Sequence, residues 1–107
     1  KFTEVSKKYS DVYCELAGKM NPLHISKDSY LVKTLCKIFN DVTNSNSEPI
    51  AIGGATYARA FDNFVSFGAN LPGQKDMCHQ TDEFISIDNL ITAYEIYCRA
   101  IKELLIM

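Results

Sequence analysis

The spacing of apolar residues predicts three helices. Residues 2–9 carry apolar side chains at helical steps. A longer stripe, at steps of three and four residues, covers residues 31–42, and the most regular one covers residues 87–105. Each of the two longer stripes follows small polar residues that favour the first position of a helix. The candidate N-cap residues are Ser26, Asp28 and Ser86.

Three other segments have the pattern of strands. Apolar and polar residues alternate over residues 12–16, a short apolar run at 49–52 ends in two glycines, and residues 63–68 form another apolar run. A Pro-Gly pair within residues 70–75 indicates a turn. The predicted order is helix, strand, helix, strand, strand, helix. This order predicts an α/β fold in which helices cover a small sheet.

Length and composition exclude several classes of protein. A chain of 107 residues with 47% apolar residues can form one compact core but not two full domains. The 11 Lys and Arg against 13 Asp and Glu give a net charge of −2, so no nucleic-acid partner is expected. No apolar run approaches the roughly 20 residues that span a bilayer, so no membrane association is expected. The chain begins with Lys1, and we expect it to be part of a longer protein.

The four cysteines are widely spaced and form no Cys-x-x-Cys pair, which argues against a zinc ribbon and a dithiol redox motif. Their even number permits two disulfides. The apolar content nevertheless favours cysteines that are small buried hydrophobic residues, in a protein of the reducing cytoplasm. These cysteines are Cys14, Cys36, Cys78 and Cys98.

Of the two histidines, His79 is the better candidate for chemistry, because His24 lies in a proline-containing connection where an exposed imidazole is expected. Asp82 and Glu83 follow His79 by three and four residues, and carboxylates at that range can orient a metal-ligating histidine. One histidine does not make a metal site, and Asp76 and Glu83 are conceivable further ligands. An ordinary imidazole with no metal remains an alternative.

A glycine loop is the second candidate site. Gly53, Gly54, Ala55 and Thr56 follow the apolar run and precede Arg59. Backbone N–H groups close to a guanidinium suit a carboxylate or a phosphate. A tight turn that needs a positive φ is an equally good interpretation of two adjacent glycines.

The ordered motifs of the second half resemble the C-terminal end of PepV-type dipeptidases. These enzymes belong to the zinc aminoacylase and dipeptidase superfamily, with succinyl-diaminopimelate desuccinylase and acetylornithine deacetylase. Upstream, residues 28–35 are similar to the last helix of that family's lid domain. The motifs that carry the resemblance lie at residues 52–60, 64–68, 72–73, 79–80 and 82–85.

The resemblance implies a two-domain enzyme, with an α/β catalytic domain that holds two zinc ions and an inserted lid domain of ferredoxin-like type. By this comparison, residues 1–52 are the end of the lid, with helix, strand, helix and strand. Residues 53–107 are the closing segment of the catalytic domain, with the glycine loop, the histidine and the final helix.

The same resemblance assigns roles to individual residues. His79 matches the family's last metal ligand, and Asp82 and Glu83 would support it or be structural. Residues 53–56 match the loop whose backbone binds the carboxylate end of the substrate, and Arg59 closes that motif. Ala55 stands where these proteins often have a third glycine.

Other parts of the family's active site have no counterpart in this chain: the first His-x-Asp, the bridging Asp, the Glu-Glu pair with the general base, and the lid histidine. The resemblance therefore implies a zinc-dependent hydrolase of dipeptides as the parent, with the isolated fragment inactive. Cobalt and manganese also suit imidazole. Three alternatives stay open: a parent that deacylates N-acyl or N-succinyl amino acids, a stand-alone non-catalytic α/β binding module, and a purely structural fragment. We expect the isolated chain to self-associate through its apolar stripes.

Overall fold

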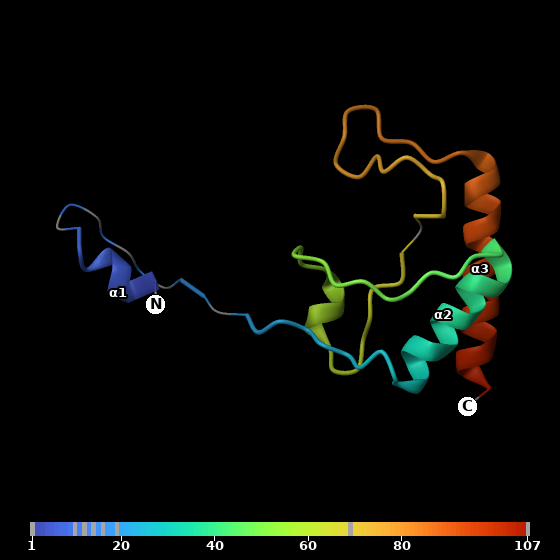
Figure 1. Cartoon of the computed structure of the whole chain (residues 1–107), viewed down its shortest axis with the longest axis horizontal. Helices are drawn as coiled ribbons and strands as arrows, with labels where there is room; N and C mark the ends of the chain where they lie inside the picture. Colours follow the sequence, from blue (N-terminus) through green and yellow to red (C-terminus); the bar gives the residue numbers. More distant parts are fainter. Residues whose placement is uncertain are drawn as a thin grey trace.

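The computed structural model describes residues 2–9, 11, 13, 15, 17–18, 20–68 and 70–106. Its elements, in chain order, are the helix α1 (Phe2–Ser6), the helix α2 (Tyr30–Thr43), the 3-10 helix η1 (Tyr57–Ala60) and the helix α3 (Ile87–Leu105) (Figure 1). The three predicted helices are confirmed, although α1 is shorter than predicted. The sequence pattern did not predict η1.

A serine begins α2, but it is not one of the predicted caps. The Ser29 side chain accepts a hydrogen bond from the Val32 N–H at 3.3 Å and so satisfies a donor that the first turn leaves unpaired. Ser26 and Asp28 were wrong as N-caps: the Ser26 hydroxyl instead accepts from the Asp28 N–H at 3.1 Å, in the turn before the helix. The helix therefore starts one residue later than Asp28 would have placed it.

Replacing Ser29 with alanine is expected to destabilise α2 by about 1 kcal/mol, because the Val32 N–H loses its partner. The measurement is thermal unfolding followed by circular dichroism at 222 nm. Ser26→Ala is the matched control and should have a smaller effect, since Ser26 bonds only within an exposed turn. Equal effects of the two substitutions would contradict the assignment of the cap.

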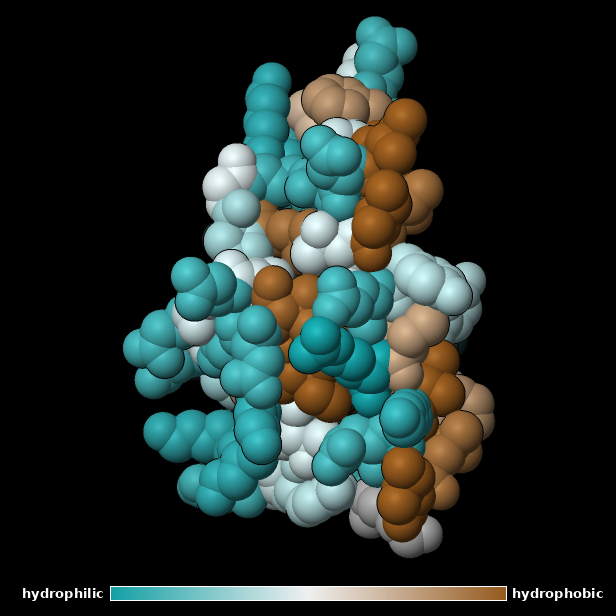
Figure 2. Space-filling model, turned by 90° about the vertical axis from the view of Figure 1, so that its right-hand side faces the viewer, coloured by the Kyte–Doolittle hydropathy of each residue, from teal (hydrophilic) through white to brown (hydrophobic). Residues whose placement is uncertain are grey.

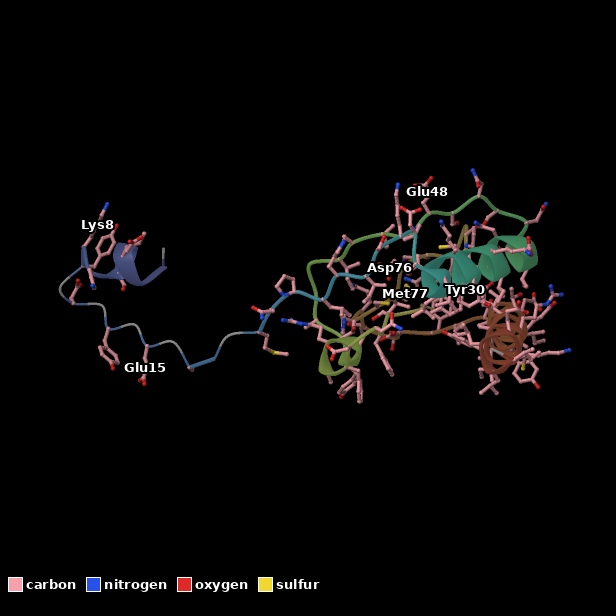
Figure 3. The ribbon with its side chains drawn as sticks, turned by 90° about the horizontal axis from the view of Figure 1, so that it is seen from below. Lys8, Glu15, Tyr30, Glu48, Asp76 and Met77 are labelled. Atoms are coloured by element: carbon pink, nitrogen blue, oxygen red, sulfur yellow. The ribbon has the colours of Figure 1, made fainter. Side chains whose placement is uncertain are left out.

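The final helix begins as predicted. The Ser86 side chain accepts from the Asn89 N–H at 3.2 Å, and Asp88 places a carboxylate in the first turn, where the helix dipole favours it. α3 then packs along α2, as Figures 1 and 3 show. The buried residues of this helix pair are Val32 and Leu35 of α2 and Ala93, Ile96 and Ala100 of α3.

An aromatic cluster holds part of the long connection between the helices against them. The Phe67 ring lies edge-on to Phe39 of α2 and to Tyr97 of α3, with ring centroids 6.4 and 5.9 Å apart. The Tyr97 hydroxyl also donates to the Phe67 carbonyl at 3.2 Å. Phe67 therefore packs against both helices and holds this part of the connection beside them.

The predicted strands were wrong. The described residues contain no strand, and of the predicted strand at 12–16, residues 12, 14 and 16 lie outside them. Residues 49–52 form no element, with Ile50 85% exposed, and residues 63–68 are likewise without a partner strand. A strand exists only when its backbone groups pair with a neighbouring strand, and alternation of side chains does not supply that neighbour.

The predicted α/β fold is therefore corrected to a helical one over the part of the chain that the structure describes. The predictions of a ferredoxin-like lid and of a closing strand are wrong for the same reason, because the described residues contain no strand. The predicted turn is confirmed: the Gln74 N–H donates to the Leu71 carbonyl at 3.0 Å. Gly73 has the φ of 79° that the third position of a type II turn requires.

The chain buries little of its surface. Six apolar residues of the described part are buried, Leu71 and the five of the helix pair. The accessible surface is 9419 Å², whereas a compact monomer of 12.0 kDa exposes about 6000 Å². The radius of gyration is 18.9 Å, against roughly 13 Å for a compact chain of this length. α1 lies apart from the helix pair (Figures 1 and 3).

Two of the cysteines differ from the prediction. Cys78 and Cys98 are exposed, Cys36 is half-buried, and all three are free thiols, while Cys14 lies outside the described residues. Burial, and to a lesser extent the charge of Glu48, raises the pKa of the Cys36 thiol. Across the described ranges, no helix combines the length and hydrophobicity needed to cross a membrane.

Candidate functional site

The glycine loop is an open bend on the surface. Gly53 and Gly54 are exposed, and neither has a positive φ; among the described glycines only Gly73 does. A Cβ atom built at Gly53 or Gly54 would meet no heavy atom within 4 Å. The interpretation as a tight turn with positive φ is therefore wrong. Among the described residues, neither the backbone conformation nor the packing requires glycine at these two positions.

Thr56 connects the loop to η1. Its hydroxyl lies 2.7 Å from the Ser66 hydroxyl, and its carbonyl accepts the backbone N–H of Arg59 at 3.2 Å. The short helix therefore begins directly after the loop and places Arg59 within one turn of it. Ala55, which occupies the position of a possible third glycine, is exposed.

The Arg59 side chain is half-buried and only partly satisfied. Its Nη2 donates to the Asn21 carbonyl at 3.0 Å. Its Nε is buried, and the described residues offer this atom no acceptor. A buried donor without a partner costs about 1–3 kcal/mol. A carboxylate or phosphate oxygen is the kind of acceptor that a guanidinium binds best.

His79 lies on an exposed turn before α3. The Gln80 N–H donates to the Met77 carbonyl at 3.1 Å and closes this turn. His79 and Asp82 both have a φ of 59°, in the left-handed region that non-glycine residues seldom enter. Glu83, like His79 and Asp82, is exposed. The backbone thus turns sharply twice within four residues.

Asp76 stabilises the backbone directly before His79. Its Oδ1 accepts the Cys78 N–H at 3.1 Å, and this bond is the main reason that the pKa of the Asp76 carboxyl lies below its usual value. The same carboxylate raises the pKa of the Cys78 thiol. Figure 3 shows Asp76 and Met77 in the part of the molecule that holds the helix pair, far from Lys8 and Glu15. Cys78 is therefore kept as a thiol beside the candidate ligand.

The predicted site has two parts, the glycine loop with Arg59 and the turn with His79, and these parts lie apart in this structure. Figure 1 shows η1 and the turn before α3 on separate loops, well apart from each other. Within the described part of the chain, no group of three or more His, Cys, Asp and Glu side chains is placed to hold a metal ion. His79 could supply one ligand, and a metal site needs more than one.

Two partners of the glycine loop were not predicted from the sequence. Ser66 contacts Thr56, and Asn21 accepts from Arg59, across separations of 10 and 38 residues. Neither pair follows a helical or strand period, so the sequence contains no spacing that would have indicated them. Only the path of the loops brings these residues together.

Comparison with known proteins supplies the family. The model of Peptidase family M20/M25/M40 matches residues 9–103. "Putative dipeptidase YtjP" of Bacillus subtilis is 45% identical over 83 residues, which are 78% of this chain and 18% of the relative. A "Putative dipeptidase" of Staphylococcus epidermidis is 40% identical over 84% of this chain and 19% of its own length. "Putative dipeptidase SH1171" of Staphylococcus haemolyticus is 38% identical over 97% of this chain and 22% of its own.

This chain therefore spans about a fifth of the length of the curated relatives that it matches. No solved structure matches it. The family match covers most of the 107 residues, including the glycine loop, Arg59 and the turn with His79. The chain thus belongs to Peptidase family M20/M25/M40, a family of hydrolases.

Proposed function

We propose that this chain is part of a zinc-dependent dipeptidase, to which it contributes one metal ligand and a loop that binds the carboxylate end of the substrate. His79 is the ligand, and residues 53–56 with Arg59 form the loop. The relatives are named as dipeptidases, which supports a peptide substrate. Because the chain spans only about a fifth of their length, most of the active site belongs to the rest of such an enzyme, and the chain alone is inactive.

The observation that carries this proposal is the pair of exposed glycines. Within the part of the chain that the structure describes, no backbone angle requires the conformational freedom of Gly53 and Gly54, and no heavy atom lies within 4 Å of a Cβ atom built at either position. Residues without a Cβ at such positions allow another molecule to approach the backbone N–H groups closely. Arg59 follows within one turn and carries a buried donor, Nε, for which the described residues provide no acceptor. Both features suit the terminal carboxylate of a dipeptide or of an acylated amino acid.

The turn before α3 suits a metal ligand that completes a site whose other ligands come from the rest of the enzyme. His79 is exposed, and it is held on a backbone with two left-handed residues, a conformation that costs about 1–3 kcal/mol per residue. Strain of this kind is found at functional sites. The imidazole fits zinc, cobalt or manganese as one donor among several. A zinc ion bound there would polarise the scissile carbonyl and lower the pKa of a bound water.

Asp82 and Glu83 are proposed to support His79. Both carboxylates are exposed and follow it along the same turn. A carboxylate that accepts the second N–H of a ligating imidazole fixes the ring and raises its basicity. Within the described residues neither carboxylate accepts a hydrogen bond from His79, so this role depends on a change in the turn when the rest of the site is present.

The predicted division at residue 52, between the end of a lid and the closing part of a catalytic domain, stays a prediction. The packing of α2 against α3 crosses that division, with Leu35 on one side and Ile96 on the other. The two proposed parts therefore contact each other through α2 and α3.

A hybrid enzyme tests the proposal. The 83 residues of this chain that align with the Bacillus subtilis relative replace the matching segment of that protein, and the purified hybrid is assayed with dipeptides, N-acetyl amino acids and N-succinyl amino acids. We expect zinc-dependent hydrolysis of dipeptides by the hybrid and none by the 107-residue chain alone. The unaltered relative is the control.

The substrate panel separates the alternatives. Hydrolysis of acylated amino acids in preference to dipeptides would favour a deacylase parent. A folded hybrid that hydrolyses none of the three classes, beside an active unaltered relative, would contradict the proposed function.

A further inference from the structure

The last turn of α2 carries an asparagine whose side chain makes three hydrogen bonds. The Asn40 Oδ1 accepts the backbone N–H of Ser47 at 2.8 Å and the Ser45 hydroxyl at 2.9 Å, and the Asn40 Nδ2 donates to the Ser47 carbonyl at 3.0 Å. One side-chain amide therefore pairs with both backbone groups of Ser47, as a neighbouring strand would. Asn40 is half-buried, which partly shields these bonds from water.

These bonds do more than close the end of α2. The main-chain carbonyl of Asn40 already accepts the N–H groups of Asn44 and Ser45, and Asn44 reverses the chain with a φ of 49°. Such main-chain bonds satisfy the end of a helix by themselves. Asparagine is also a poorer helix former than alanine. The Asn40 side chain therefore serves the segment after the helix rather than the helix itself.

After this contact the chain turns back along α2. Residues 47–49 line one shallow hollow with Cys36 and Lys33, which lie one and two turns before Asn40 in the helix. The glycine loop begins four residues later. We call residues 47–67, which include the glycine loop and the arginine after it, the loop segment. Its start therefore lies against α2.

The same part of α2 holds the other end of the loop segment. Phe39, the residue before Asn40, packs edge-on against Phe67, with ring centroids 6.4 Å apart. Ser66 precedes Phe67, and its hydroxyl lies 2.7 Å from that of Thr56 at the end of the glycine loop. Figure 1 shows this segment leaving the end of α2, running out to η1 and returning toward the helices. Two adjacent residues of one helix therefore attach both of its ends.

Burial of apolar side chains does not fix the loop segment between these ends. Residues 48–57 are exposed throughout, and Ile50, Ile52 and Tyr57 are 85, 60 and 95% exposed. Figure 2 likewise shows apolar side chains on the surface, in a column down one side of the molecule. Apolar contacts stabilise a position only where they remove surface from water. The position of the glycine loop in this chain therefore depends on hydrogen bonds and on the attachments at the two ends.

We propose that Asn40 is a positioning residue for the glycine loop: its side chain fixes the start of the loop segment on α2, beside the point where Phe39 holds the end of that segment. The consequence for catalysis rests on the proposed function, in which the loop binds the carboxylate end of the substrate. The attachment itself does not depend on that function. Asn40 acts through the placement of Gly53 and Gly54 and touches neither substrate nor metal.

Amide hydrogen exchange of the 107-residue chain, resolved by residue with NMR, tests the attachment. We expect Asn40→Ala to lower the protection factor of the Ser47 N–H about 10-fold, because this group loses its acceptor. The Ser45 N–H is the internal reference, since it bonds to the main-chain carbonyl of Asn40, which the substitution leaves in place. An equal loss of protection at both amides would make Asn40 a cap of α2. That result, or unchanged protection at Ser47, would overturn the proposal.

Two further variants separate the hydrogen bonds from other effects of the substitution. Asn40→Asp keeps an oxygen that accepts the Ser47 N–H, so most of the protection at Ser47 should remain. Asn46→Ala is the matched control: it removes the same amide from an exposed residue beside Ser47 and should leave the protection factors unchanged. If Asn40→Asp exposed the Ser47 N–H as fully as Asn40→Ala does, the Asn40 oxygen would not be its acceptor and the proposal would fail.

The hybrid enzyme tests the consequence for catalysis. In it, Asn40→Ala should raise the KM for a dipeptide about 10-fold with little change in kcat or metal content, because a displaced loop weakens the binding of substrate and transition state alike. Asn40→Asp should restore part of this loss, and Asn46→Ala should cause none. An unchanged KM, or a joint loss of kcat and metal, would refute the positioning role. An inactive hybrid that retains Asn40 would contradict the proposed function instead, and the protection factors would still decide the attachment.

Discussion

Replacing His79 with alanine is expected to remove metal from the hybrid peptidase and to abolish its hydrolysis of dipeptides. The loss of a residue that merely supports a ligand weakens metal affinity by about 10–100-fold, so the loss of the ligand itself should exceed that range. The measurement is metal content after gel filtration, with kcat/KM for a dipeptide determined on the same sample. This result follows from the proposed function and from the exposed turn that presents the imidazole.

His24→Ala is the matched control, because His24 is the second of the two histidines in the chain and is also exposed. It should leave metal content and kcat/KM unchanged. If His79→Ala retained both, His79 would be an ordinary surface residue, and the role carried over from the resemblance would be lost. Circular dichroism of the two variants distinguishes a lost ligand from a lost fold.

Replacing Ile96 with alanine is expected to lower the free energy of unfolding of the helix pair by about 2–5 kcal/mol. Ile96 is 2% exposed and lies at the centre of the contact between α3 and α2. A domain is typically stable by only 5–15 kcal/mol, and this core is small, so the loss should melt much of the helix content. Urea unfolding followed at 222 nm, at low micromolar concentration, measures it.

Ile91→Ala is the control for this second prediction. It removes the same atoms from the same helix, but its side chain is 60% exposed and faces away from α2. The cost should be under about 1 kcal/mol, since little apolar surface is returned to water. Equal losses at Ile91 and Ile96 would mean that α2 and α3 do not share the core described for them.

The residues of the candidate site come from the sequence, and their roles stay a prediction. The range that the family model matches includes Gly53, Arg59 and His79. The resemblance could not show that the glycine loop and the turn before α3 lie apart in this chain, nor that Ser66 and Asn21 contact the loop. Those contacts depend on the path of loops that have no repeating pattern.

The helices were predictable from sequence because their determinants are local. Each backbone hydrogen bond of α3 joins residues four apart, its cap at Ser86 acts within three residues, and its stripe repeats with the helical period. The strands were not predictable, because the pairing of residues 49–52 or 63–68 depends on a neighbour that their own sequence does not specify. Likewise, the stripe of α3 showed that the helix needs apolar partners. Only tertiary packing decided that Ile96 faces α2 and Ile91 faces outward, because burial depends on which surfaces meet.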